Sequence, residues 1–454
     1  MCSFNYCLVR ELHLLYTIRR MIRGGFSMYI KELSIRNFKS IKEALISFSP
    51  LGMIVGANAA GKSNLINVLR FIQDIVCDGV DSAVALQGGM TYLANACLPK
   101  GQPIEIGFVL DLSEEAWIRR IPSKDYSFKP IELSYRFRLQ PHKKGSGYRI
   151  AYDYIKMTFE LLQMGQGGQK ADKYSRTGNY CSYIYEKKSI QSSVQMRIEY
   201  SEDTVSAELQ KSCTEDNTMS FFSFFANEAN RELMLNMIEI LLPSQFNVNS
   251  FIRIFDFDPR ELKKPSSISS ARSLAEDGSN IALVLQSILR NKENRLKLTT
   301  ILNNFLPFIG GVSIETNLDK SCSYKITETY SNRSFYANFL SDGTVSIIAL
   351  IVALYFEEKS KIIILEEPER NIHPKLLASL LSCAEEISTE KQVIITTHNP
   401  EFLKYANINN LLLVSRDEFG YTRVTAPKDS SLVQRFIQDN LELNDLFIQD
   451  LLGE

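Results

Sequence analysis

The residues Gly56 to Ser63 read GANAAGKS and directly follow the short apolar run LGMIV. In the pattern GxxxxGK[ST], glycines let backbone N–H groups turn onto phosphate oxygens, and the next helix adds its positive N-terminal end. Lys62 is then expected to reach the terminal phosphates of a nucleotide, and the Ser63 hydroxyl to bind Mg²⁺. We expect the phosphate-binding loop to comprise Gly56, Ala57, Asn58, Ala59, Ala60, Gly61, Lys62, Ser63 and Asn64.

A pair of carboxylates forms the second motif, in the stretch IIILEEPE. Four apolar residues indicate a buried strand, and ligands of parallel sheets bind beyond the carboxyl ends of the strands. Glu366 is therefore expected to hold Mg²⁺, directly or through water, and Glu367 to polarise an attacking water. An isolated Glu-Glu pair after a strand is as often a solvated edge, so this hypothesis depends on the upstream loop.

Two further stretches could contact phosphate. In QVIITTHNP, His398 follows another apolar run and is expected to sense the γ-phosphate, although a lone histidine is more often structural. In FLSDGTVSII, the residues Ser341, Asp342 and Gly343 open a helix, whose N-terminus can bind an anion. The alternative is an ordinary helix capped by Ser341 or Asp342.

The elements that must position these residues follow from hydrophobic periodicity. YIKELSIRNF alternates like a strand, and Leu65, Val68, Leu69 and Ile72 form one helical face after the loop. The sequence predicts antiparallel strands within residues 104–200, a polar loop at 165–195, helices over most of 216–306, and strands near 311–317 and 323–330. It also predicts a helix from Val345 and buried strands before Glu366 and His398, which together indicate an α/β protein.

The domain organisation follows from these changes in pattern. Residues 1–27 are predicted to be an extension upstream of a natural start at Met28, with an amphipathic helix as the alternative. We expect an N-terminal lobe over 28–110, an inserted region with an antiparallel sheet and then helices over 111–310, and a C-terminal lobe over 311–454.

Composition narrows the class of protein. The chain has 454 residues, 45% of them hydrophobic and 23% charged, which is ordinary for a globular protein. Eight cysteines without a CxxC pair, and only four histidines, exclude a recognisable zinc cluster and favour reduced thiols in the cytoplasm. No apolar run reaches the ~18 residues of a membrane span.

One segment has a local charge excess although the whole chain has a net charge of −1. Residues 119–149 contain nine basic residues against Asp125 and Glu132, with aromatic residues among them. Such a segment could bind the phosphate backbone of DNA, or it could be a solvated sheet face. The basic residues are Arg119, Arg120, Lys124, Lys129, Arg136, Arg138, Lys143, Lys144 and Arg149.

Taken in order, these motifs resemble the ABC-type ATPase heads. That group includes the structural-maintenance-of-chromosomes (SMC) proteins, recombination-repair ATPases and the overcoming-lysogenization-defect family. The sequence is most similar to compact AAA-family members that lack coiled-coil arms. The stretches IKELSIRNFKSIKEALISF, FDFDP, LSDGT and LNDLFIQDLLGE carry the resemblance, which extends over nearly the whole chain from Met28 and is weakest at 110–240. It implies an ABC-type P-loop head with an inserted antiparallel sheet and helical region.

The resemblance also implies roles that spacing does not give. LSDGT resembles the signature motif, so Ser341, Asp342 and Gly343 would contact ATP bound by a second protomer in a homodimer or higher assembly. A glutamine that binds Mg²⁺ is expected, and Gln87 is the candidate; Asn371 is expected at the dimer interface. Ala60 replaces a commoner glycine, which is tolerable if its φ is negative.

The function implied is that of an ATP-hydrolysing switch. Only 56 residues follow His398, too few for the C-terminal nuclease domain of some relatives. We therefore expect a separate effector, a nuclease or toxin, as in anti-phage systems such as Septu, PARIS or retrons. The alternatives are a DNA-engaging ATPase in repair or chromosome maintenance and, less favoured, the nucleotide-binding subunit of a transporter.

Overall fold

The computed structural model describes most of the chain in two compact units. By contacts, one unit comprises residues 1–34 and 100–246, and the other residues 35–99 and 247–454. The expected extension 1–27 and much of the expected helical stretch, including 215–231 and 239–250, lie outside the described residues. The lobe boundaries drawn from the sequence stay predictions. The described residues are 28–99, 101–114, 118–120, 126–142, 147–164, 174–188, 193–201, 207–214, 232–238, 251–267, 273–431, 433, 435 and 443–449.

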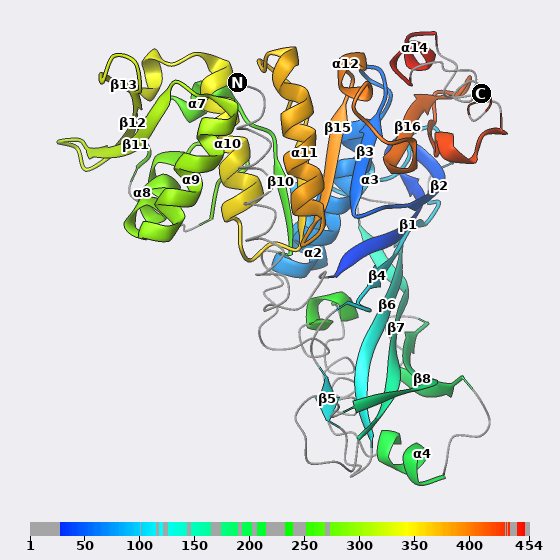
Figure 1. Cartoon of the computed structure of the whole chain (residues 1–454). Coiled ribbons are helices and arrows are strands. Elements are labelled where there is room, and N and C mark those ends of the chain that lie inside the picture. The colour runs from blue at the N-terminus through cyan, green and yellow to red at the C-terminus, as the bar shows by residue number, and fades with distance from the viewer. Residues whose placement is uncertain are drawn as a thin grey trace. The chain divides into compact units, whose positions relative to one another are not determined.

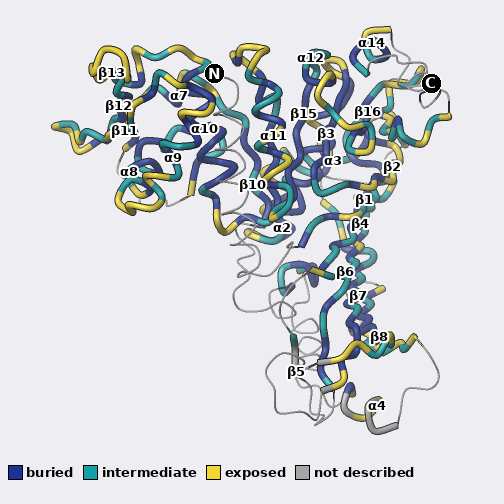
Figure 2. Tube along the Cα trace, viewed as in Figure 1, coloured by how far each residue is buried: buried dark blue, intermediate teal, exposed yellow. Residues whose placement is uncertain are grey.

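The second unit is built on a six-stranded sheet with the order β10-β14-β15-β3-β16-β17. Every neighbouring pair is parallel except β16 and β17, which are antiparallel. The apolar runs LGMIV and QVIITT are buried along their whole length, as expected for central parallel strands, and are drawn dark blue in Figure 2. The strands are β3 (Leu51–Val55), β10 (Ile252–Phe255), β14 (Ile362–Glu366), β15 (Gln392–Thr397), β16 (Leu411–Arg416) and β17 (Thr422–Thr425).

Helices of this unit confirm the predicted periodicity. The helix α2 (Lys62–Leu86) begins directly after the loop, buries the predicted face, and is interrupted at Gly79, where φ is 85°. The helix α10 (Asp342–Phe356) is apolar on all sides and is buried from Thr344 to Tyr355, beside α11 (Leu377–Ser388) (Figure 1). The shorter helices are α3 (Met90–Leu93), α7 (Pro259–Leu262), α8 (Ile281–Arg290), α9 (Lys292–Phe305), α12 (Pro400–Leu403) and α14 (Leu443–Ile448).

A small three-stranded sheet packs with α8 and α9. It contains β11 (Ile309–Thr316), β12 (Cys322–Glu328) and β13 (Ser334–Tyr336), joined antiparallel in that order. Its first two strands confirm those predicted near 311–317 and 323–330. Single-turn 3₁₀ segments in this unit are η3 (Ala337–Phe339), η4 (Pro374–Leu376), η5 (Ile408–Asn410) and η6 (Pro427–Asp429).

The first unit is an antiparallel sheet. Its strands follow the order β4-β6-β7-β8-β9, β5 pairs with β6, and β1, which is divided between the units, pairs with β4 and β2. The strands and short helices are β1 (Tyr29–Phe38), β2 (Ile41–Ser47), β4 (Ile104–Asp111), β5 (Arg119–Arg120), β6 (Tyr126–Pro141), β7 (Tyr148–Met164), β8 (Tyr174–Lys187), β9 (Gln195–Tyr200), α4 (Ala207–Thr214) and η1 (Met234–Met237).

The antiparallel strands predicted for this region are confirmed, but the polar loop predicted at 165–195 is wrong in part. Residues 174–187 form the strand β8, paired with β7 over most of its length. Cys181, Tyr183 and Tyr185 are fully buried there. The strand begins with polar residues, so the sequence pattern alone indicated a loop. Pairing with β7 is what makes this segment a strand.

A buried polar cluster holds η1 against the sheet of the first unit. Asp153, on β7, is fully buried and accepts hydrogen bonds from Tyr135 Oη at 2.6 Å and from the Met234 backbone N–H at 2.7 Å. Burial raises the pKa of Asp153 to about 6, although these hydrogen bonds and nearby Lys187 act in the opposite direction.

Three general features of the described residues bear on function. No helix among them has the length and apolar character needed to cross a membrane. They contain no group of three or more His, Cys, Asp or Glu placed to bind a metal ion. The cysteines described are all free thiols, namely Cys77, Cys97, Cys181, Cys213, Cys322 and Cys383.

Candidate nucleotide-binding site

The predicted motifs meet at one edge of the parallel sheet. The strands β3, β10, β14, β15 and β16 run parallel, so the residues after their last residues lie along one edge. These residues include Gly56, Asp256, Glu367 and His398, and Arg416 ends β16. The carboxyl edge is where parallel α/β sheets bind ligands.

The phosphate-binding loop needs its glycines for specific steric reasons. A Cβ on Gly56 would overlap the backbone oxygen of Val414 on β16, and one on Gly61 would overlap the Thr422 side chain on β17. Gly61 also has φ of 115°, a left-handed conformation that favours glycine. Ala59 has a left-handed backbone conformation, with φ of 63°, whereas φ of Ala60 is not positive. The condition set from the sequence for Ala60 is therefore met.

The β16–β17 hairpin holds the loop by hydrogen bonds that the sequence did not predict. Arg416 Nε donates to the Ala59 backbone oxygen at 3.0 Å, and Thr422 Oγ1 donates to that of Ala60 at 3.2 Å. Ser40 contacts Thr422 at 2.7 Å between hydroxyl oxygens and also accepts from Asn64 Nδ2 at 2.5 Å. The carbonyls of Ala59 and Ala60 are thereby fixed, and within the loop the Ala60 N–H donates to the Ala57 backbone oxygen at 3.2 Å.

Lys62 is the buried cation of the site. Its side chain folds back over the loop and donates from Nζ to the backbone oxygens of Gly56 at 2.8 Å and Ala57 at 3.1 Å. Burial lowers the pKa of Lys62, and nearby Glu367 acts against that shift. Ser63, the next residue, is exposed in the first turn of α2, where backbone N–H groups have no partner within the helix.

Glu367 lies at the centre of three cationic or titratable side chains. Its Oε1 is 3.9 Å from Lys62 Nζ and 3.0 Å from His398 Nδ1, the latter at ion-pair distance rather than in a directed hydrogen bond. Its Oε2 accepts from Arg370 Nε at 2.9 Å. Burial alone raises the pKa of Glu367, but Arg370 and His398 outweigh it and the pKa is lowered. The structure thus keeps this carboxylate anionic and places Lys62, Glu367 and His398 together.

Arg370 and Asp256 are site residues that sequence reasoning missed. Arg370 Nη1 donates to Asp256 Oδ1 at 2.8 Å while Nε holds Glu367. Asp256 belongs to the stretch FDFDP, and the second aspartate, Asp258, caps α7 by accepting from the Arg260 N–H at 2.8 Å. The available signal was that Asp256 follows an apolar run, IRIF, as Glu366 does.

Glu366 is a carboxylate whose charge is only partly compensated by its cationic neighbour. Arg70 Nη2 lies 3.5 Å from Glu366 Oε1, but the same guanidinium donates with both terminal nitrogens to Glu276. Burial, and secondly Asp256, raise the pKa of Glu366 to about 7 against the opposing effect of Arg70. Negative charge at this position is therefore incompletely compensated, and the exposed Ser63 hydroxyl supplies a second oxygen donor. Such a donor set fits Mg²⁺, which binds one or two protein oxygens together with phosphates and waters.

Gln87, the predicted glutamine ligand of Mg²⁺, lies at the C-terminal end of α2. Its Oε1 accepts from Lys39 Nζ at 2.8 Å. Burial raises the pKa of Asp74, and a hydrogen bond with Gln87 offsets part of that shift. Asp74 also lies near Arg70, and Arg70 Nη2 lies 3.5 Å from Glu366 Oε1.

The LSDGT stretch caps α10, which is the local role predicted for it. Ser341 Oγ accepts from the Thr344 N–H at 3.2 Å, and Asp342 pairs at 2.5 Å with Lys263, the residue after α7. A Cβ on Gly343 would overlap the Asn371 backbone oxygen, so glycine is required. None of the hydrogen bonds or ion pairs found among the described residues joins Ser341 to Lys62, Glu367 or His398 within the chain.

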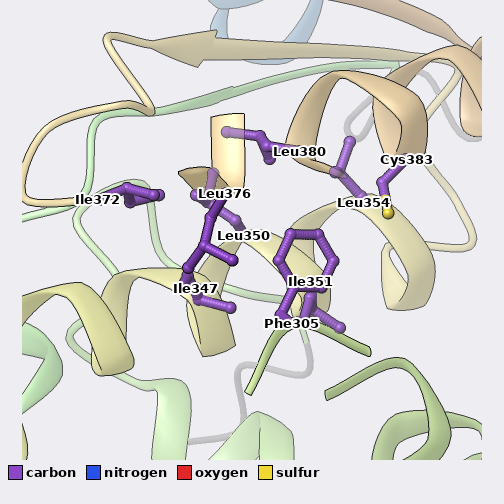
Figure 3. A pocket seen from close by; sticks show the side chains of 9 residues that line it. All are labelled: Phe305, Ile347, Leu350, Ile351, Leu354, Ile372, Leu376, Leu380 and Cys383. Atoms are coloured by element: carbon purple, nitrogen blue, oxygen red, sulfur yellow. The ribbon is translucent and has the colours of Figure 1, made fainter. Parts of the chain in front are cut away.

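An enclosed hollow between α10 and α11 is unsuited to a nucleotide. Figure 3 shows that only apolar side chains and one thiol line it, with no charged group to receive phosphate. The lining residues are Phe305, Ile347, Leu350, Ile351, Leu354, Ile372, Leu376, Leu380 and Cys383.

Comparisons with known proteins identify a family for this chain. Residues 28–403 match the family profile described as "AAA ATPase domain". The Septu protein PtuA of Bacillus thuringiensis is 28% identical over 120 residues, a match that covers 23% of this chain and about 30% of that protein's length. Among solved structures, an Smc head bound to the C-winged helix domain of ScpA is similar at 16% identity and a TM-score of 0.48, over 87% of this chain and 97% of that one. An Smc head from Pyrococcus furiosus is similar at 13% identity and a TM-score of 0.48, over 90% of this chain and 100% of that one.

Proposed function

Because this chain belongs to the AAA ATPase domain family, we propose that it binds ATP with Mg²⁺ at the carboxyl edge of the parallel sheet and hydrolyses it. The observation that carries the proposal is the position of Glu367 between Lys62 and His398, beside the phosphate-binding loop. The ammonium group of Lys62, the carboxylate of Glu367 and the imidazole of His398 are thus all available to one phosphate group. We propose that the protein is cytoplasmic, because the cytoplasm supplies ATP and Mg²⁺ and keeps thiols reduced.

The reaction proposed is attack of water on the γ-phosphorus. Lys62 leaves the backbone oxygens of Gly56 and Ala57 and binds phosphate oxygens, which compensates the lost hydrogen bonds. Glu367, anionic at neutral pH, orients the water and accepts its proton as the bond to the β–γ bridging oxygen breaks. His398 contacts the γ-phosphate. Ser63 and Glu366 would hold Mg²⁺, together with Gln87 as the glutamine ligand expected from the sequence; when bound, the ion would neutralise charge on the β- and γ-phosphates.

The proposed switch is a dimer with ATP between two protomers. Ser341, Asp342 and Gly343 begin α10, and in this proposal they face the nucleotide of a second protomer. In this arrangement Ser341 and Gly343 contact the γ-phosphate bound by the partner subunit, and its hydrolysis opens the dimer.

The proposed role is control of a separate effector, a nuclease or toxin, in anti-phage defence. Local similarity to the Septu protein PtuA supports this role, although it covers only 120 residues. The alternative, an ATPase that acts on DNA in repair or chromosome maintenance, shares the same site and differs in what hydrolysis drives.

The test is the mass of the Glu367→Gln variant by light scattering with and without Mg-ATP, expressed alone and with the products of flanking genes. The variant should bind ATP without turnover, so ATP should double its mass. The matched control is Lys62→Ala combined with Glu367→Gln, whose mass should ignore ATP. A nuclease or toxin that co-purifies would support effector control; a mass unchanged by bound ATP would overturn the dimer proposal.

A further inference from the structure

The basic segment predicted at 119–149 lies only partly within the described residues. Lys124, Lys143 and Lys144 lie outside the described residues, and only the backbone is described for Arg119 and Arg120. Two of the remaining basic residues, Arg136 and Arg138, occupy the outward face of β6. They alternate with inward side chains that are almost completely buried, namely Tyr135, Phe137 and Leu139.

Two tyrosines of β7 share this outward face. Arg136 is paired directly with Tyr154, and Arg138 with Tyr152, so all four side chains project to the same side of the sheet. The rings of Tyr152 and Tyr154 are nearly parallel, at 8°, with centroids 6.2 Å apart. The guanidinium of Arg138 lies over the Tyr152 ring, 5.9 Å from its centroid. We call these four residues the tyrosine face.

The two arginines of the tyrosine face differ in their acidic partners. Arg138 donates to Glu105 Oε2 at 2.8 and 3.0 Å, and Glu186 lies near Tyr152. Arg136, in contrast, is exposed and has no carboxylate at ion-pair distance among the described residues. Both tyrosines are only partly buried. Parallel rings beside an exposed guanidinium match a ligand that offers flat rings and negative charge.

We propose that the tyrosine face binds single-stranded nucleic acid, with bases stacked on Tyr152 and Tyr154 and a backbone phosphate on Arg136. Unpaired bases expose their ring faces to aromatic side chains, whereas a duplex hides them between neighbouring base pairs. DNA and RNA single strands share this chemistry. The tyrosine face shares no residue with the nucleotide-binding site, so we expect it to bind without ATP.

The experiment uses fluorescence anisotropy to measure binding of the full chain, without ATP, to fluorescein-labelled nucleic acids. The probes are oligothymidylate and oligouridylate of about 20 nucleotides and duplex DNA of about 20 base pairs. Tyr152→Ala combined with Tyr154→Ala should weaken single-strand binding about fivefold or more. The matched control is Tyr152→Phe with Tyr154→Phe, which keeps both rings and should bind like the wild type. Arg136→Gln should lower the slope of log affinity against log salt by about 0.7.

Each outcome decides the proposal. Tighter binding of either single strand than of duplex, lost in the alanine variant and kept in the phenylalanine variant, supports it and shows whether DNA or RNA is preferred. Equal or tighter binding of duplex, or wild-type affinity in the alanine variant, overturns it. Should the alanine variant fail to fold, an unchanged salt slope for the exposed Arg136→Gln overturns it as well. The ATPase rate of these variants should stay that of the wild type, which separates this proposal from the proposed function.

Discussion

Arg370 holds Glu367 from the side opposite Lys62: its Nε lies 2.9 Å from Glu367 Oε2, and its Nη1 extends to Asp256, 2.8 Å away. The guanidinium therefore couples the proposed base to the end of the neighbouring strand β10. Arg370 and Asp256 are each nearly half exposed, so the pair should add at most about 1 kcal/mol to stability. The main effect of the Arg370–Asp256 pair should be to orient the Glu367 carboxylate.

We expect Asp256→Ala to lower the rate of ATP hydrolysis about tenfold to a hundredfold, because a misplaced base loses alignment with its water. ATP affinity and melting temperature should change little. The measurement is phosphate release at saturating Mg-ATP. The control is Asp258→Ala, which removes the α7 cap two residues away and should leave the rate unchanged. A wild-type rate for Asp256→Ala would show that Arg370 positions Glu367 without Asp256.

Lys62→Ala should abolish ATP binding. Lys62 is the buried cation of the loop, and its loss removes the positive charge that faces the phosphates. Titration calorimetry with Mg-ATP measures this directly. Lys264→Ala, an exposed lysine paired with Glu261, is the control and should bind as the wild type does. Full affinity in Lys62→Ala would place the nucleotide elsewhere.

Ser341→Arg should leave ATP binding intact and block hydrolysis, because the long side chain would occupy the face offered to the partner. Ser341→Thr keeps the cap on α10 and is the control. The sharper test mixes two inactive variants. Ser341→Arg retains an intact loop and Lys62→Ala an intact signature, so a mixed dimer contains one complete site and should regain hydrolysis. A mixture as inactive as its components would contradict a shared site.

Stability of the first unit should depend on the protonation of Asp153. Its pKa is 3.8 in the reference state and about 6 when folded, so the folded protein binds this proton more tightly. The resulting stabilisation is complete below the unfolded pKa and is lost as pH rises through the folded pKa, with a limit of about 3 kcal/mol. Asp153→Asn cannot titrate, so its free energy of unfolding relative to the wild type should rise by up to that amount between about pH 4 and about pH 7.

Urea unfolding at several pH values, followed by a signal from the first unit, measures this difference. Burial lowers the pKa of nearby Lys187, and Asp153 acts against that shift. A pH-independent difference between Asp153→Asn and the wild type would mean that Asp153 stays ionised in the folded protein.

The sequence by itself determined which segments carry the chemistry. Apolar runs that end in GANAAGKS, in Glu366–Glu367 and in His398 are local patterns, and each formed the predicted buried strand with its polar residues at the carboxyl end. The helical face of Leu65, Val68, Leu69 and Ile72 was equally local. A pattern within about ten residues of the chain reports the periodicity of its own helix or strand.

Tertiary structure alone decided which of these segments meet. Asp256 became part of the site because β10 pairs with β14, about a hundred residues later. Arg416 and Thr422 hold a loop more than 350 residues before them. The strand β8 was hidden in a polar stretch until β7 supplied its partner. Pairing between distant strands is set by mutual burial and hydrogen bonding across the sheet, and no single segment records it.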